Sequence, residues 1–147
     1  MEAARDPTTT AKGEHTMSSV YEKPVSGSID EVGERLVRAV ELHKYGVLGT
    51  IDLKEKMNSK GVEFEPACRV YEVCNPVKAS EVLQHDMSVS TALPCRISIY
   101  EFGGQLRLAT LKPTRILGVF GHEELNQQAL QVEQDLIAII DEVAAAE

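Results

Sequence analysis

One segment constrains the fold more than any other, because it has the pattern of a β-hairpin. Two runs rich in β-forming residues, 96–102 and 105–111, flank Gly103 and Gly104. A two-residue hairpin turn requires positive φ angles, which glycine adopts without strain. The resulting register pairs Ile99 with Leu108 and puts four apolar side chains on one face of the hairpin: Ile97, Ile99, Leu106 and Leu108.

Two amphipathic helices are available to cover that face. Ser28 and Glu31 form a capping box, in which each side chain bonds a free backbone N–H at the start of a helix. We expect this helix to end near Tyr45-Gly46, where glycine can take the left-handed conformation. A longer helix starts near Gly121. The apolar stripes of the two helices are Ile29, Val32, Leu36 and Val40, and Leu125, Ala129, Val132, Leu136, Ile139, Ile140 and Val143.

The other segments predict shorter elements. They are strands at 20–25, 47–53 and 68–74, a helix from 76 to about 85, helical turns at 54–57 and 114–119, and a loop at 86–93. Pro24 confines the first strand to an edge or an end of the sheet. The order is β-α-β-(short α)-β-α-β-β-α, so we predict an α+β fold, a mainly antiparallel sheet with helices packed on one side. We expect one core to contain Leu36, Val40, Ile97, Ile99, Leu108, Leu136 and Ile139.

The composition is that of a globular protein. The 147 residues are 43% hydrophobic and 26% charged, which suits one domain with a single core. Residues 1–16 are polar and aperiodic, so we expect a disordered tail there and a single α+β domain over 17–147. No apolar run approaches the roughly 20 residues that span a bilayer, and 1–16 do not resemble a signal peptide. We therefore expect a cytoplasmic protein that keeps its three cysteines as thiols.

The charge pattern argues against nucleic acid as a partner. The formal net charge is −8, and no cluster of Lys and Arg is visible. Nucleic-acid binders usually carry a basic face, because neutralising phosphates supplies much of their affinity. The few aromatic residues are not interleaved with basic ones, so no stacking platform for bases is indicated. We expect neither nucleic acid nor a membrane as a partner.

Two short motifs place a cysteine where an extended segment meets a proline: Cys74-Asn75-Pro76 and Leu93-Pro94-Cys95. Asn75 is a good helix N-cap and Pro76 a good first helical residue. Cys74 therefore precedes a helix, whose positive end should lower the pKa of the thiol unless apolar groups surround the sulfur. Cys95 lies on the strand face of the buried isoleucines. Each cysteine is thus either a reactive group or a small buried hydrophobic residue.

Taken together, several spaced motifs resemble a bacterial and archaeal family, the domain of unknown function numbered 302. They are residues 45–53, 69–76 and 93–95, the turn at 102–104 and the proline at 113, and the resemblance covers about residues 20–143. It implies a compact α+β fold, often dimeric, with no assigned activity. It also implies that Cys74 and Cys95 are the characteristic thiols and that Cys68 is not. Lys112 departs from the acidic residue that family members tend to have before this proline. We therefore expect a weaker helix after it.

If the two thiols converge, three chemistries are open: a reversible disulfide, a soft metal ion, or a covalent thiol or sulfur adduct. We expect their Cα atoms to lie within about 7 Å, the range that permits a disulfide. Metal binding is the weakest of these, because no C-x-x-C or H-x-x-x-H spacing occurs. We interpret His43, His85 and His122 as scattered surface or helix-end residues and expect no metal site.

Our first functional hypothesis is a small ligand-binding or redox-responsive module built around Cys74 and Cys95. Asn75 would order the turn, and the ligand would be a small molecule or a thiol. The alternative is a structural or interaction protein, a homodimer with inert buried thiols. A conventional enzyme ranks third, because no acid–base set is visible, and Glu63 and Glu65 lie in an acidic segment that we expect to be exposed. No sequence motif identifies a cofactor.

Overall fold

The computed structural model describes residues 18–146, so the predicted tail at 1–16 lies outside the described residues. The elements in chain order are β1 (Val20–Val25), α1 (Ile29–Leu42), β2 (Gly46–Asp52), α2 (Leu53–Ser59), β3 (Cys68–Cys74), α3 (Pro76–His85), η4 (Met87–Ala92), β4 (Cys95–Phe102), β5 (Gln105–Leu111), α4 (Pro113–Phe120), η5 (Glu123–Leu125) and α5 (Asn126–Ala145), where η marks a 3-10 helix. The predicted α+β class and the order of the main elements are confirmed. The expected loop at 86–93 contains η4.

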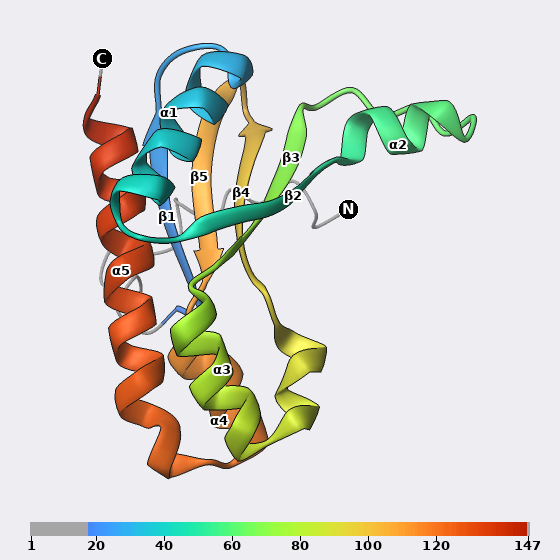
Figure 1. Cartoon of the computed structure of the whole chain (residues 1–147). Coiled ribbons are helices and arrows are strands. Elements are labelled where there is room, and N and C mark those ends of the chain that lie inside the picture. Colours follow the sequence, from blue (N-terminus) through green and yellow to red (C-terminus); the bar gives the residue numbers. More distant parts are fainter. Residues whose placement is uncertain (1–17, 147) are drawn as a thin grey trace.

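The strands form one sheet with the order β1-β5-β4-β3-β2, and each neighbouring pair is antiparallel (Figure 1). The hairpin has the predicted register, with Ile99 opposite Leu108. Gly103 and Gly104 have φ angles of 62° and 76°, as the two-residue turn requires. β1, which contains Pro24, is an edge strand, as expected.

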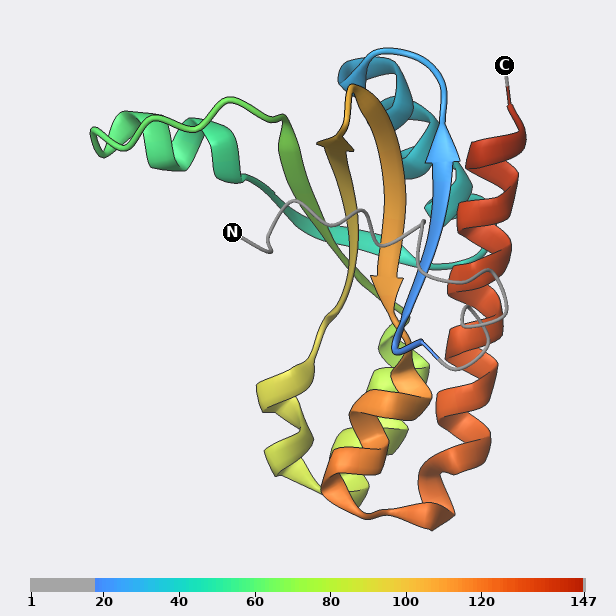
Figure 2. The same cartoon turned by 180° about the vertical axis from the view of Figure 1, so that it is seen from behind.

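Apart from α2, the helices form two groups. α1 and α5 pack against each other and against one face of the sheet (Figure 1). Among the described residues, no helix lies across the opposite face (Figure 2). α3, η4 and α4 gather beyond one end of the sheet, where β3 ends and β4 begins, while α2 projects beyond the opposite end. The N-terminal part of α5 packs against α3 and α4. The long last helix therefore joins the two groups.

The core lies between the sheet and the pair α1–α5. All seven predicted core residues are fully buried in one cluster. A second, smaller cluster fills the space between α3, η4, α4 and the start of α5. It consists of Val82, Val89, Leu117, Leu125 and Ala129.

The predicted end of α1 is wrong in one respect. The helix ends at Leu42, and the left-handed residue is Lys44, with φ of 71°, because Gly46 already belongs to β2. The N–H of Tyr45 bonds the carbonyl of Val40, and the N–H of Lys44 bonds that of Glu41. This is the pair of bonds of a Schellman motif, with lysine in the position that usually holds glycine.

The end of the chain also differs from the prediction. Gly121, with φ of 73°, ends α4 instead of beginning the last helix, and α5 starts at Asn126. Lys112 forms no capping hydrogen bond, as expected for a lysine. Glu133 of α5 accepts hydrogen bonds from the backbone N–H of Thr114 (3.1 Å) and from its hydroxyl (2.6 Å). A residue from another helix thus satisfies an N–H in the first turn of α4.

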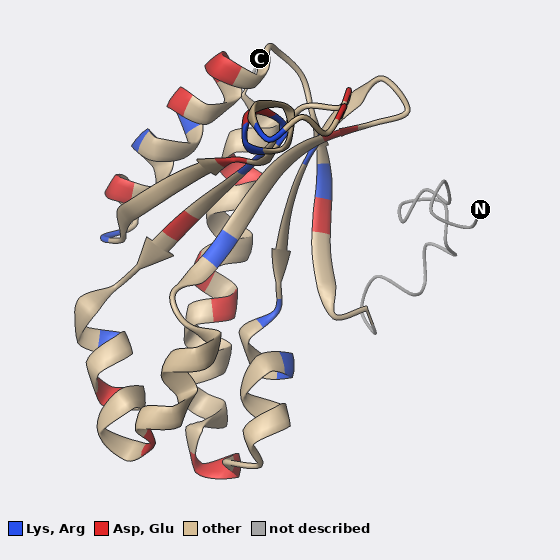
Figure 3. Cartoon of the chain, turned by 90° about the vertical axis from the view of Figure 1, so that its right-hand side faces the viewer, with Lys and Arg blue, Asp and Glu red and all other residues tan. Residues whose placement is uncertain are grey.

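Charge is spread over the fold. Lys and Arg do not gather along one element or one edge of the ribbon in Figure 3, and acidic residues lie between them. Glu63 and Glu65 are exposed, as expected. Among residues 18–146, no helix is both long and apolar enough to cross a membrane.

Truncating a core residue will show whether the face of α1 is assigned correctly. Leu36 is fully buried, whereas Leu42 in the same helix is 73% exposed. We expect Leu36→Ala to lower the free energy of unfolding by roughly 2–5 kcal/mol and Leu42→Ala to change it by less than about 0.5 kcal/mol. Urea unfolding followed by circular dichroism measures both. Equal losses would contradict the assignment.

A second pair of variants tests the approach of α1 to the sheet. A Cβ atom at Gly33 would collide with the hydroxyl of Tyr71 on β3, whereas a Cβ atom at Gly118 in α4 would meet open space. We expect Gly33→Ala to destabilise the protein by about 1–3 kcal/mol through overpacking. Gly118→Ala should stabilise it by about 0.5–1 kcal/mol, because alanine has the better helix propensity. Thermal unfolding of the two proteins gives the comparison, and stabilisation by Gly33→Ala would rule out the close contact.

Candidate functional site

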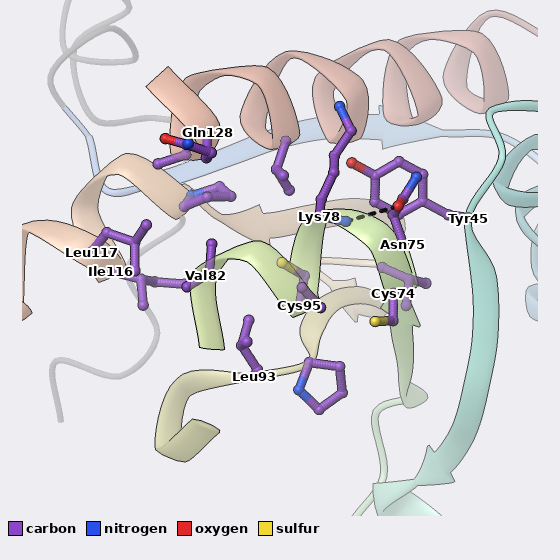
Figure 4. Close-up of a pocket in the computed structure, with 16 residues that line it drawn as sticks. Tyr45, Cys74, Asn75, Lys78, Val82, Leu93, Cys95, Ile116, Leu117 and Gln128 are labelled. Atoms are coloured by element: carbon purple, nitrogen blue, oxygen red, sulfur yellow. Dashed lines mark hydrogen bonds between the residues drawn. The ribbon is translucent and has the colours of Figure 1, made fainter. Parts of the chain in front are cut away.

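An apolar cavity lies where the sheet meets the group of α3, η4 and α4 (Figure 4). About 60 Å³ of it is open to the centre of a water-sized sphere, and it is bounded on one side by α5. Small side chains on the facing helices, Ala79 of α3 and Ala129 of α5, leave this space unfilled. The apolar walls include Val73, Val82, Leu93, Leu117 and Val132. The cavity therefore lies between the two hydrophobic clusters.

The start of α3 forms one edge of the cavity and has the predicted cap. The side-chain oxygen of Asn75 accepts a hydrogen bond from the N–H of Lys78 at 3.1 Å, and Pro76 occupies the first turn. The amide nitrogen of Asn75 donates to the carbonyl of Lys44 at 3.3 Å. Asn75 thus holds the turn from β3 into α3 against the end of α1.

Cys74 and Cys95 both line the cavity, from the ends of neighbouring strands (Figure 4). Cys95 pairs with Val73, so strand geometry puts the Cα atoms of the two cysteines roughly 6 Å apart. A regular strand would turn Cys74 away from the face that Val73 and Cys95 share, but β3 ends at Cys74. Cys68 lies at the other end of β3, opposite Tyr100. All three cysteines are free thiols.

Burial raises the pKa of the Cys74 thiol, whereas the helix end was expected to lower it if the sulfur was free of apolar surroundings. The condition for a lowered pKa, a sulfur free of apolar surroundings, is not met. In addition, the side chain of Asn75 and not the sulfur accepts the hydrogen bond from the first turn of α3. Burial raises the pKa of Cys95 to about 11. The neighbouring Cys74 adds to this increase, and the charge of Arg96 opposes it. Both groups are therefore thiols at neutral pH.

Polar contacts beside the cavity join Tyr45 and Lys78 to Asp135 of α5. The hydroxyl of Tyr45 donates to Asp135 Oδ2 at 2.8 Å, and Lys78 Nζ lies 3.3 Å from the same oxygen. Burial, and then the hydrogen bond to Asp135, raise the pKa of Tyr45 far above its ordinary value. The hydroxyl of Tyr45 therefore stays protonated, and it donates its hydrogen bond to Asp135. These contacts connect the end of α1 and the start of α3 to α5.

Gln128 is a further residue of the site, which we did not predict. Its side chain lines the cavity. Its side-chain oxygen is buried and accepts no hydrogen bond from the described residues. Leaving a buried acceptor without a partner costs about 1–3 kcal/mol. The sequence contained one signal for it: Gln128 lies between Leu125 and Val132, at helical spacing within the apolar stripe of α5.

Of the other candidates, the histidines differ most from expectation. We interpreted them as scattered, but the rings of His85 and His122 lie 5.1 Å apart, centre to centre. His43 is separate and lies 3.0 Å from Glu142. The two adjacent histidines lie outside the cavity wall.

Comparison with known proteins agrees with the motifs. The family described as "Domain of unknown function DUF302" matches residues 21–143. The chain belongs to this family. The crystal structure of an uncharacterized conserved DUF302 protein from Bacillus stearothermophilus is similar to this chain and 32% identical in sequence. The match covers 84% of this chain and 96% of that one, with a TM-score of 0.81. None of the curated proteins compared with this DUF302 chain matches it.

Thiol modification will test the burial of both cysteines. Because a raised pKa leaves less thiolate at neutral pH, we expect iodoacetamide to modify native Cys74 and Cys95 at least about tenfold more slowly than free cysteine at pH 7. The rates should keep rising with pH beyond about 8.5, where the rate for an ordinary thiol levels off. Mass spectrometry of digested samples assigns the sites, and the protein unfolded in guanidinium is the control. Rapid modification of native Cys74 at pH 7 would show that its thiol is activated after all.

Proposed function

We propose that this DUF302 protein is a small-ligand-binding module, and that its site is the cavity lined by Cys74, Cys95 and Gln128. Ligand sites are mostly apolar and carry a few polar groups that orient the ligand. This cavity has that composition, and it is formed where separate elements of the fold meet. Three free cysteines fit a reducing compartment, which supports our placing the protein in the cytoplasm.

The unpartnered oxygen of Gln128 carries the proposal. A ligand that places a hydroxyl or amine hydrogen at this oxygen would supply the missing hydrogen bond. The rest of the ligand would be apolar, because the walls offer Val82, Leu117 and Val132. The chemistry that fits is therefore a small apolar molecule with one donor group.

The two thiols contribute as weakly polar contacts. Attack on a disulfide or an electrophile requires a thiolate, and burial disfavours the thiolate at both Cys74 and Cys95. We therefore favour ligand binding over a redox response as the role of this pair.

A matched pair of probes tests the site. Benzyl alcohol has an apolar ring and a hydroxyl donor, whereas toluene lacks the donor. We expect benzyl alcohol to bind with a Kd of the order of 1 mM, as its size allows, and toluene to bind more weakly. Chemical shifts of the backbone amides in ¹H–¹⁵N spectra report both titrations. Gln128→Met should remove the preference for benzyl alcohol.

A filled cavity provides the control. Ala79→Leu should abolish binding of both probes, whereas Val77→Leu, at a 68% exposed position of the same helix, should leave it unchanged. If benzyl alcohol fails to shift the amides of α3 and α5, or binds Ala79→Leu as well as the wild type, the cavity is not a ligand site.

The alternative, a homodimer with inert thiols, has one observation in its favour. A shallow hollow lies on the face of the sheet that no described helix crosses. Val20, Leu111 and Val119 at its border are 40%, 49% and 84% exposed. Sedimentation equilibrium tests this candidate: a dimer of the wild type that Val119→Glu dissociates and Leu42→Glu leaves intact would support it.

A further inference from the structure

The end of α3, η4 and the turn between α4 and α5 lie together at one end of the molecule (Figure 1). This region carries a second group of side chains that could bind a ligand. His85 is the last residue of α3, while His122 and Glu124 belong to the turn after α4. Among residues 18–146, they form a group whose ligand atoms, one from each residue, all lie within 4.8 Å of one another. This group is separate from the thiol-lined cavity.

The two imidazole rings converge on one carboxylate oxygen of Glu124. Glu124 Oε2 lies 2.5 Å from His85 Nε2 and 3.3 Å from His122 Nδ1. A tetrahedral zinc ion, with bonds of about 2.0–2.2 Å, holds its ligand atoms roughly 3.3 Å apart. Small rotations of these side chains therefore suffice to place an ion between them. Two imidazoles and a carboxylate are ligands that suit Zn²⁺.

A fourth residue orients His122. This residue is Asp86, whose Oδ2 lies 2.6 Å from Nε2 of His122, on the side of the ring opposite to Glu124. Asp86 Oδ1 accepts hydrogen bonds from the N–H of Ser88 (2.9 Å) and from its hydroxyl (2.6 Å), so the carboxylate is held in place. With the proton on Nε2, the Nδ1 of His122 presents a lone pair towards Glu124. Metal-binding histidines typically have such a carboxylate behind them.

The backbone that carries these groups is fixed by packing. Val82, Val89 and Leu125, each close in sequence to one of the four residues, belong to the smaller hydrophobic cluster. Gly121, with its positive φ angle, turns the chain back towards α3 after α4. The side chains themselves remain accessible, since those of His85 and Glu124 are 39% and 55% exposed. An ion can enter from solvent, and water can complete its coordination.

We propose that His85, His122 and Glu124 form a Zn²⁺ site, in which Asp86 positions His122. His85 would bind through Nε2, His122 through Nδ1 and Glu124 through its carboxylate, and water would take the fourth position. The ion would join the end of α3 to the turn before α5.

Isothermal titration of the metal-free full chain with ZnCl₂ tests the site. We expect one ion per chain, with binding lost in His85→Ala and in His122→Ala. Asp86→Asn should weaken binding about 10–100-fold, as removal of an outer-shell partner usually does. The matched control is His43→Ala, because His43 also contacts a carboxylate but, among residues 18–146, belongs to no group of three ligand residues.

Spectroscopy of the wild type keeps the test independent of any variant that fails to fold. Ring ¹⁵N shifts should show Nδ1 of His122 and Nε2 of His85 bound to the metal. Co²⁺ in place of Zn²⁺ should give no sulfur-to-cobalt charge-transfer absorption. Absence of binding, binding that persists in His122→Ala, or a sulfur signal that Cys74→Ser removes would each overturn the proposal.

Discussion

The burial of Ile97, Ile99 and Leu108 beneath α1 and α5 is the interaction on which the rest of the structure depends. A slip of one residue in the pairing of β4 and β5 would turn every side chain of the moved strand to the opposite face. The turn at Gly103-Gly104 prevents that slip, because it sets which residues are paired. The same face of β4 begins at Cys95. The register that buries the isoleucines therefore also brings Cys95 opposite Val73 and into the cavity wall.

Much of the fold could be predicted because its signals are local. The capping box, the Gly-Gly turn and the Asn75-Pro76 cap each lie within four residues, and each is present in the structure. The end of α1 could not be placed in this way. Tyr45 is buried and bonds Asp135 of α5, so the chain must turn just before it, and Lys44 adopts the left-handed conformation that this turn requires. A distant contact there outweighs the preference for glycine.

The candidate site was predictable only in part, for the same reason. Cys74 and Cys95 stand next to prolines that mark element boundaries, so local patterns identified them. Their pKa values depend on what surrounds the sulfur, and helices that start elsewhere in the chain provide those surroundings. The meeting of His85 and His122 depends on where α3 and α4 end, and 36 residues separate the two. No spacing rule for adjacent ligands applies across such a distance.

α3 connects the two sites that we describe. Its first turn is held by Asn75 at the cavity, and its last residue, His85, contacts Glu124. A helix of ten residues is roughly 15 Å long, so both ends belong to one short rigid body. The cluster beneath it has five buried residues, whereas the main cluster is much larger. A ligand in the cavity and an ion at His85 would therefore restrain the same helix on the less extensively packed part of the fold. Any change that one causes in the affinity of the other must be reciprocal.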